Sequence, residues 1–295
     1  MKLAAAPISW GICEVPGWGD MLPVTRVLDE MAALGFTATE LGAPGFLPDE
    51  PAALRAQLEA RGLALAGGFV PLVLHDRTKD AAAIHAAIRA ADLLRGAGGD
   101  VFVTAAITDE QWSPRRPLTD QEWAHLAHML QRLTELTGER GLRHVVHPHV
   151  GTVVQNSDEV ERLLELSDVS WCLDTGHLWV GGFDPVEFAH RYGDRVGHVH
   201  LKDVDESVAV KVRSGELDLM AAVQLGLFQP LGRGDVAIDQ VVTHLESEGY
   251  QSWYVLEQDT AITGAAPSPG TGPMLSVAES LEYLRAIVDG HPAHR

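Results

Sequence analysis

Short apolar runs rich in β-formers alternate with longer amphipathic segments along the whole chain, and this alternation limits its fold more than any other feature. Repeated strand–helix units of this kind build parallel sheets covered by helices. The apolar runs predict eight strands: Ala5–Trp10, Phe36–Leu41, Leu63–Val70, Asp100–Ala105, Arg143–His147, Ser170–Asp174, Gly197–Leu201 and Trp253–Glu257. The amphipathic segments predict eight helices: Pro23–Leu34, Pro51–Arg61, Asp80–Gly96, Thr119–Arg140, Ser157–Leu166, Pro185–Tyr192, Ile238–Gly249 and Ser276–Val288.

Eight strands, each followed by a helix, favour a single (β/α)8 barrel, the TIM barrel of the α/β class. The chain has 295 residues, slightly more than the roughly 250 that are typical of this fold. We therefore expect one domain over residues 1–295, and a doubly wound open sheet is the alternative.

Two segments depart from the repeat. Val204–Gly234 follows the seventh predicted strand and is far longer than a βα loop of about 2–6 residues. We expect residues 204–234 to form an insertion that covers the active site and contains some helix. Residues 264–274, rich in Gly, Pro, Ala and Ser, are expected to form a flexible loop.

The charge of the chain restricts its partners. Its 41 acidic and 22 basic residues give a net charge of −19, which repels nucleic acid and anionic membranes. The apolar stretch at the N-terminus breaks at Pro7, too early for a signal peptide or a membrane span. Cys13 and Cys172 lack metal-type spacing, and we expect no disulfide. We expect a cytoplasmic protein without a nucleic-acid or membrane partner; whether it forms a homo-oligomer stays open.

The end of the seventh predicted strand reads V-G-H-V-H-L-K-D, from Val196 to Asp203. Because side chains alternate along a strand, His198, His200 and Lys202 share one face. Imidazole and ammonium groups on that face indicate a metal or proton-transfer site. The alternative is a pair of hydrogen-bonded core histidines.

Other predicted strands also end in polar residues, and a barrel brings these ends together at one mouth. The second ends at Glu40, the fifth in H-P-H, the sixth in D-T-G-H and the eighth in L-E-Q-D. Asp174 is either a ligand or the cap of the next helix. Glu257 is either a ligand or a salt-bridge partner of Lys202 or Arg233. Of the H-P-H pair, one histidine suits a metal and the other a substrate, with His147 favoured as the ligand over His149.

These residues suggest a metal centre with His147, Asp174, His200 and Glu257 as ligands. Two imidazoles and two carboxylates suit Mn²⁺, Co²⁺, Fe²⁺ or Zn²⁺ more than Mg²⁺ or Ca²⁺. Such a metal polarises a ketone and stabilises an enolate. Lys202 is a candidate acid–base group, because a neighbouring cation should lower its pKa.

Several motifs resemble those of the xylose-isomerase-like superfamily, and within it those of the myo-inosose-2 dehydratases. They cover nearly the whole chain: W-G-I-C-E-V-P-G-W-G at Trp10–Gly19, H-P-H-V-G-T-V-V-Q at His147–Gln155, L-D-T-G-H at Leu173–His177, H-V-H-L-K-D-V-D at His198–Asp205, the insertion Lys211–Phe228, and P-L-G-R-G-D at Pro230–Asp235. The resemblance implies a TIM barrel and a divalent metal, often manganese or cobalt, with Zn²⁺, Fe²⁺ and Mg²⁺ also compatible. It implies Asp174, His200 and Glu257 as ligands. Many members have a glutamate at the end of the fifth strand, where this chain has His147.

The same resemblance implies an enzyme, a lyase that dehydrates a small polyhydroxylated ketone of the inosose type. The route passes through an enolate to a 1,2-diketone. From their positions at strand ends, Lys202 and His177 are the candidate acid–base residues, and Glu40, His149 and Arg233 the candidates that orient substrate hydroxyls. The alternatives are a metal-dependent isomerase, epimerase or keto-glycoside lyase of sugars, and a barrel that binds without catalysis.

Overall fold

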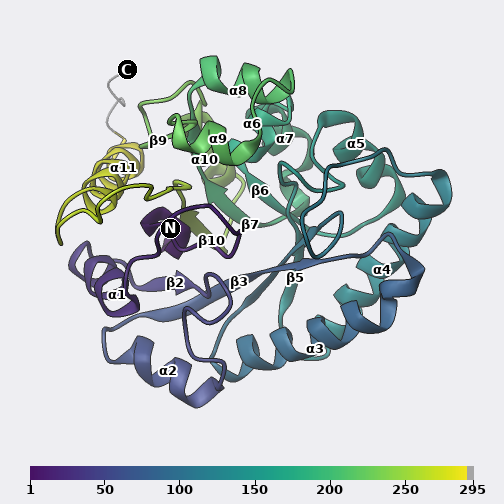
Figure 1. The fold of residues 1–295 in the computed structure, drawn as a ribbon, viewed down its shortest axis with the longest axis horizontal. Coiled ribbons are helices and arrows are strands. Elements are labelled where there is room, and N and C mark those ends of the chain that lie inside the picture. Colours follow the sequence, from purple (N-terminus) through teal and green to yellow (C-terminus); the bar gives the residue numbers. More distant parts are fainter. Residues whose placement is uncertain (291–295) are drawn as a thin grey trace.

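The computed structural model describes residues 1–290, which fold around a closed barrel of eight parallel strands (Figure 1). Around the barrel the strands follow the order β1-β10-β7-β6-β5-β4-β3-β2. Their bounds are β1(Lys2–Ala5), β2(Ala38–Glu40), β3(Ala64–Leu72), β4(Val101–Ala106), β5(Arg143–Val146), β6(Trp171–Asp174), β7(Val196–Leu201) and β10(Trp253–Leu256). The predicted TIM barrel is therefore confirmed.

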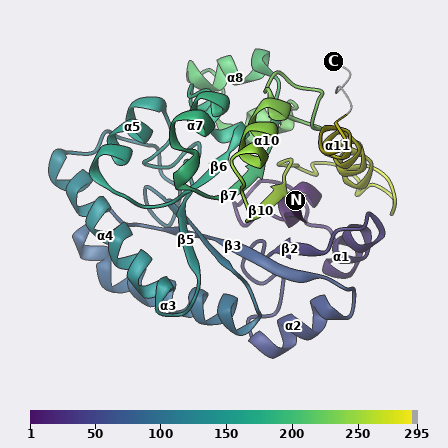
Figure 2. The same cartoon turned by 180° about the vertical axis from the view of Figure 1, so that it is seen from behind.

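Helices surround the barrel in both views (Figures 1 and 2). The main ones are α1(Val24–Ala33), α2(Pro51–Glu59), α3(Asp80–Gly96), α4(Asp120–Gly138), α5(Ser157–Leu166), α6(Thr175–Val180), α7(Pro185–Tyr192), α10(Ile238–Ser247) and α11(Pro273–Val288). Of these, α3, α5 and α7 have the predicted bounds. Helices α4 and α5 each begin with a capping box, in which a side chain at each position satisfies a backbone N–H at the other. None of the helices in residues 1–290 is long and apolar enough to cross a membrane.

The first strand lies earlier in the chain than predicted. Instead of Ala5–Trp10, it spans Lys2–Ala5, and a 3-10 helix, Pro7–Trp10, follows it. Pro7 has no N–H to donate to a strand ladder, which ends the strand before it. The buried Trp10 instead donates its indole N–H to Glu30 on α1, at 2.7 Å.

The insertion after β7 contains a short antiparallel pair, β8(Asp203–Val204) and β9(Phe228–Gln229), and two helices, α8(Glu206–Arg213) and α9(Leu219–Gln224). It lies at one edge of the barrel, green in Figure 1.

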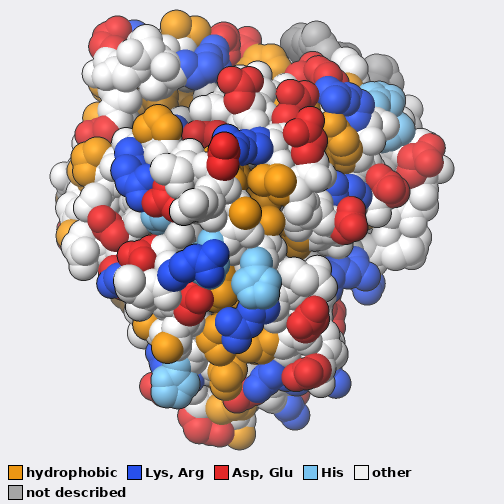
Figure 3. All heavy atoms as spheres, turned by 90° about the vertical axis from the view of Figure 1, so that its right-hand side faces the viewer, with side chains coloured by type: hydrophobic (Ala, Val, Ile, Leu, Met, Phe, Trp, Pro, Cys, Tyr) orange, Lys and Arg blue, Asp and Glu red, His pale blue; other side chains and the backbone are white. Residues whose placement is uncertain are grey.

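The surface drawn in Figure 3 carries acidic and basic side chains close to one another, with histidines and apolar side chains between them.

Asp203 fixes the segment by which the insertion returns to the barrel. Its carboxylate accepts four backbone N–H groups, from Val204, Gly232, Gly234 and Val236, at 2.8–3.0 Å. A Cβ atom on Gly234 would collide with Asp203. The P-L-G-R-G-D motif is therefore a clamp in which glycine lets the backbone approach a buried carboxylate.

Candidate active site

Strand β7 carries His198 and His200 on one face, as the alternation of the strand predicts. Nε2 of His198 lies 2.8 Å from Oε1 of Glu40, and Nε2 of His200 lies 3.2 Å from the same oxygen. All three side chains are buried. One carboxylate oxygen of Glu40, from β2 on the other side of the barrel, therefore contacts both imidazoles. Nδ1 of His200 lies on the opposite side of the ring from this contact.

That nitrogen faces two carboxylates. Nδ1 of His200 lies 3.1 Å from Oε2 of Glu257 and 3.5 Å from Oδ2 of Asp174, yet it makes no hydrogen bond within residues 1–290. Burial lowers the pKa of His200, but the charges of Glu257 and Glu40 outweigh it and raise that pKa well above its usual value.

The two oxygens of the Asp174 carboxylate have different partners. Oδ1 accepts the backbone N–H of His177 at 2.7 Å and so caps α6. Oδ2 lies 2.9 Å from Nζ of Lys202 and 3.3 Å from Nε2 of His147. Gly176 makes this approach feasible, because a Cβ atom there would lie 2.6 Å from Cβ of Lys202.

Lys202 is buried among three carboxylates. Its Nζ lies 2.9 Å from Asp174, 2.5 Å from Glu257 and 3.3 Å from Asp259. Burial lowers the pKa of Lys202, but the negative charges of Asp174, Asp259 and Glu257 outweigh it and hold that pKa well above its usual value. The expected fall of this pKa is therefore wrong for the protein without a bound cation, because carboxylates surround the ammonium group.

His147 presents a lone pair to Asp174. Its Nδ1 lies 2.8 Å from the carbonyl oxygen of Pro148, which can only accept, so Nδ1 carries the proton. Burial lowers the pKa of His147, which keeps the ring neutral. Nε2 then has no proton, although it lies 3.3 Å from a carboxylate oxygen. Two acceptors facing each other at this distance are typical of ligands that share a cation.

The rings of His149 and His177 stack, with centroids 3.8 Å apart, and they differ in tautomer. Nδ1 of His149 donates to the carbonyl oxygen of Val150 at 2.7 Å, which leaves Nε2 with a lone pair. Nδ1 of His177 accepts the backbone N–H of Val150 at 3.3 Å, so Nε2 carries the proton. Burial lowers the pKa of both rings, that of His149 to about 3. His149 therefore offers an acceptor and His177 a donor.

The four predicted ligands fit one divalent metal by their spacing and chemistry. Donor atoms of Asp174, His200 and Glu257 all lie within 4.8 Å of one another. Nε2 of His147 belongs to the same cluster because it lies 3.3 Å from Oδ2 of Asp174. Ligands bound at about 2.0–2.2 Å lie some 3–3.5 Å apart, and the pairs of neighbouring donor atoms here are separated by 3.1–3.5 Å. Nitrogen and oxygen donors together suit transition metals and zinc.

A cavity of about 1020 Å³ opens over this cluster. The polar residues of its wall include Glu40, His147, His149, His200, Lys202, Glu257 and Asp259. Trp18, Phe46, Phe69 and Trp112 contribute aromatic side chains, and the insertion contributes Asp218, Leu219 and Met220. Trp112 is the one non-glycine residue with a positive φ (55°) among residues 1–290, and strain of this kind often marks a ligand site.

Arg233 does not reach this cavity. Its exposed side chain pairs with Glu279 on α11, and it is absent from the cavity wall. The expectation that Arg233 orients substrate therefore lacks support, because the backbone on either side of it is turned inward to Asp203.

Asp259 is a residue of the site that the sequence analysis did not identify. It lies two residues beyond Glu257 in the same L-E-Q-D motif, which was the available signal.

The fold, the cavity and the acidic and histidine-rich cluster together define a TIM-barrel enzyme. The chain belongs to the xylose isomerase-like TIM barrel family, whose sequence model matches residues 28–287. A protein named inosose dehydratase from Geobacillus kaustophilus (strain HTA426) is 37% identical over 275 residues, which cover 88% of this chain and 89% of that protein. This relationship confirms the expectation that the chain is an enzyme of the dehydratase type.

Solved structures share the fold at low sequence identity. An L-ribulose 3-epimerase aligns with a TM-score of 0.72 at 14% identity, covering 98% of this chain and 94% of its own. The IOLI protein, solved with a zinc atom, aligns with a TM-score of 0.70 at 13% identity, and both chains are covered completely. A divalent metal in this chain is supported by its own cluster of nitrogen and oxygen donors.

Proposed function

We propose that this protein is a metal-dependent lyase that removes water from a keto-cyclitol of the inosose type and forms a 1,2-diketone by way of an enolate. The observation that carries the proposal is the cluster of Asp174, His200 and Glu257 beside Lys202, in a chain that is 37% identical to an inosose dehydratase. The cavity above the cluster has room for a six-membered polyol.

His147, Asp174, His200 and Glu257 are the residues that would hold the metal, with Mn²⁺ or Co²⁺ as the preferred ions. When bound, such a metal supplies a Lewis acid that polarises a ketone and favours loss of the neighbouring proton. His147 supports this assignment most directly, since its unprotonated Nε2 faces a carboxylate.

Lys202 is the proposed acid. Its ammonium group is buried at the cavity wall, and the charges that raise its pKa keep a proton on Nζ. That proton is transferred to the departing hydroxyl, which leaves as water. General acid–base groups placed in this way contribute about 10²–10⁴-fold to a rate.

His149 is the proposed base. Its Nε2 has a free lone pair and its ring lines the cavity. The proton of the carbon next to the ketone moves to this nitrogen, and the electron pair of the broken C–H bond forms the enolate. His177, whose Nε2 carries a proton, stacks on His149 and acts as a donor. Asp259, at the cavity wall beside Lys202, is placed to orient a substrate hydroxyl.

The test is incubation of the metal-loaded enzyme with 2-keto-myo-inositol. Dehydration should produce rising ultraviolet absorbance from a conjugated enol or diketone, together with loss of one water from the substrate mass. A new stereoisomer of unchanged mass without new absorbance would instead indicate an epimerase. No conversion of the inosose, with metal bound, would contradict the proposed substrate.

A further inference from the structure

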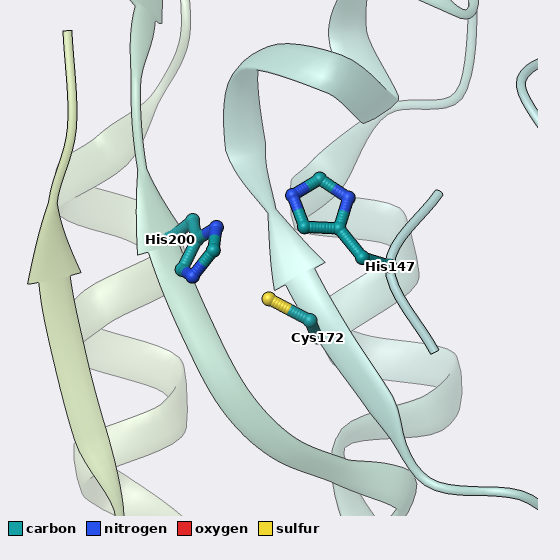
Figure 4. Close-up of side chains that lie close together, drawn as sticks. All are labelled: His147, Cys172 and His200. Carbon is teal, nitrogen blue, oxygen red and sulfur yellow. The ribbon is translucent and has the colours of Figure 1, made fainter. Parts of the chain in front are cut away.

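A second group of potential metal ligands lies deeper in the barrel than the set described above. One donor atom each of His147, Cys172 and His200 lies within 4.8 Å of the others, and all three side chains are buried. Figure 4 shows them on neighbouring segments, with the Cys172 sulfur on the side where both imidazole rings lie. The sulfur thus adds a third donor to two histidines.

The register of the barrel explains why Cys172 lies beneath the upper set. Asp174 pairs with His200 across β6 and β7, whereas Cys172, two residues earlier on the same strand face, pairs with His198. Its other neighbours are Val101, Val103 and Val145, which form an apolar floor. A cation next to the sulfur would therefore be shielded from water.

We propose that His147, Cys172 and His200 form a second, deeper position for a soft or borderline cation such as Zn²⁺, Co²⁺ or Cd²⁺. Thiolate and imidazole donors favour these ions, whereas Mn²⁺ and Mg²⁺ prefer the oxygen-rich upper set with Asp174 and Glu257. The two positions share His147 and His200, so they exclude each other. The position that a metal occupies in this barrel then depends on its softness.

Binding at the deeper position requires one proton to leave. A cysteine binds a cation as the thiolate, so the Cys172 sulfur gives up its proton when the cation binds. The S–H bond breaks, a metal–sulfur bond forms, and the proton passes to solvent. No oxidant or reductant takes part. The proposal does not depend on the dehydratase activity, because it concerns which atoms hold the metal.

Cobalt substitution tests the proposal, because a thiolate bound to Co²⁺ gives an intense charge-transfer band in the near ultraviolet that nitrogen and oxygen ligands do not give. Cys13 is the only other cysteine of the chain, so Cys13→Ser is a matched control. The band should be present in the wild type and in Cys13→Ser. It should disappear in Cys172→Ser, and also in Cys172→Ala, which is included as a second variant in case serine impairs folding.

Glu257→Gln separates the two positions, because Glu257 belongs only to the upper set. The band should persist in this variant even where dehydration is lost. Calorimetric titration should show Cd²⁺ binding weakened by about tenfold or more in Cys172→Ala, since a soft ligand is lost, with Mn²⁺ binding unchanged. The proposal is overturned if wild-type protein binds no Co²⁺, if it binds Co²⁺ without the band, or if the band survives in Cys172→Ala.

Discussion

The Glu40 carboxylate lies 3.2 Å from Nε2 of His200, and so Nδ1 of the same ring faces Asp174 and Glu257. A carboxylate behind a ligating histidine fixes the tautomer and the orientation of the ring. Because Oε1 of Glu40 is shared by His198 and His200, this oxygen is engaged with protein rather than free for substrate. We therefore propose that Glu40 positions the His200 ring. That Glu40 also orients a substrate hydroxyl stays a prediction.

Replacing Glu40 with glutamine should weaken metal binding. An amide holds the imidazole less strongly than a carboxylate does, and losses of such outer partners typically cost about 10–100-fold in affinity. Titration calorimetry with Mn²⁺ should show a Kd at least tenfold higher than that of the wild type. Glu248→Gln, an exposed change beyond α10, is the control. Equal Kd values for Glu40→Gln and wild type would show that Glu40 does not position His200.

Replacing Lys202 with methionine should abolish most of the turnover of 2-keto-myo-inositol. Methionine keeps much of the buried volume but has no proton to give to the leaving hydroxyl, so kcat should fall by about 10²–10⁴-fold. Metal content must be measured alongside, because Lys202 also contacts Asp174 and Glu257. Lys211→Met, on the exposed side of α8, should retain activity. Near wild-type turnover in Lys202→Met with unchanged metal would remove Lys202 from the mechanism.

Replacing Asp203 with asparagine should destabilise the fold without touching the cavity wall. Asparagine keeps one acceptor oxygen but turns the other into a donor, which then faces N–H groups. With hydrogen bonds to a charged group contributing about 1.5–3 kcal/mol each, we expect a loss of about 2–4 kcal/mol. Urea unfolding measures this change. The control is Asp205→Asn at the N-cap of α8, because asparagine caps about as well as aspartate. Equal stability of the two variants would refute the clamp.

Asp203 and Arg233 show how far the structure could be predicted from the sequence and where that prediction ends. Local signals such as caps, apolar periodicity and polar strand ends are properties of neighbouring residues, and they predicted the barrel, eight helices and the cluster around His200. The direction of the Arg233 side chain depends on a carboxylate 30 positions earlier in the chain, which no local pattern records. The same is true of Cys172, whose neighbours come from β4, β5 and β7.

Asp174 illustrates a different limit. Two alternatives were open for it from the sequence, helix cap or metal ligand; Oδ1 caps α6, and Oδ2 is directed to His147 and Lys202. Residue type and position could not decide between them, because an aspartate where a strand passes into a helix suits both. The geometry of the two oxygens confirms the cap and leaves Oδ2 available to a metal, so the ligand role stays a prediction.

The buried His144 should make stability depend on pH. Its ring lies between hydroxyl groups, with Nδ1 2.8 Å from Oγ1 of Thr134 and Nε2 3.1 Å from Oγ1 of Thr104. Burial lowers its pKa to about 3. In the unfolded chain His144 therefore binds a proton near pH 6.5, whereas in the folded chain the buried ring stays unprotonated at that pH. The stabilising effect is complete above about pH 6.5 and is lost as the pH falls toward 3.

The measurement is the free energy of unfolding in urea between pH 6 and pH 4, for wild type and for His144→Gln. Other buried histidines contribute to both proteins and cancel in the comparison. The wild type should lose up to about 1.4 kcal/mol more per pH unit than the variant, which corresponds to one proton. His85→Gln, an exposed change on α3, should keep the wild-type slope. If His144→Gln keeps that slope as well, His144 is not the group that titrates on unfolding, because the variant has no proton to bind at this position.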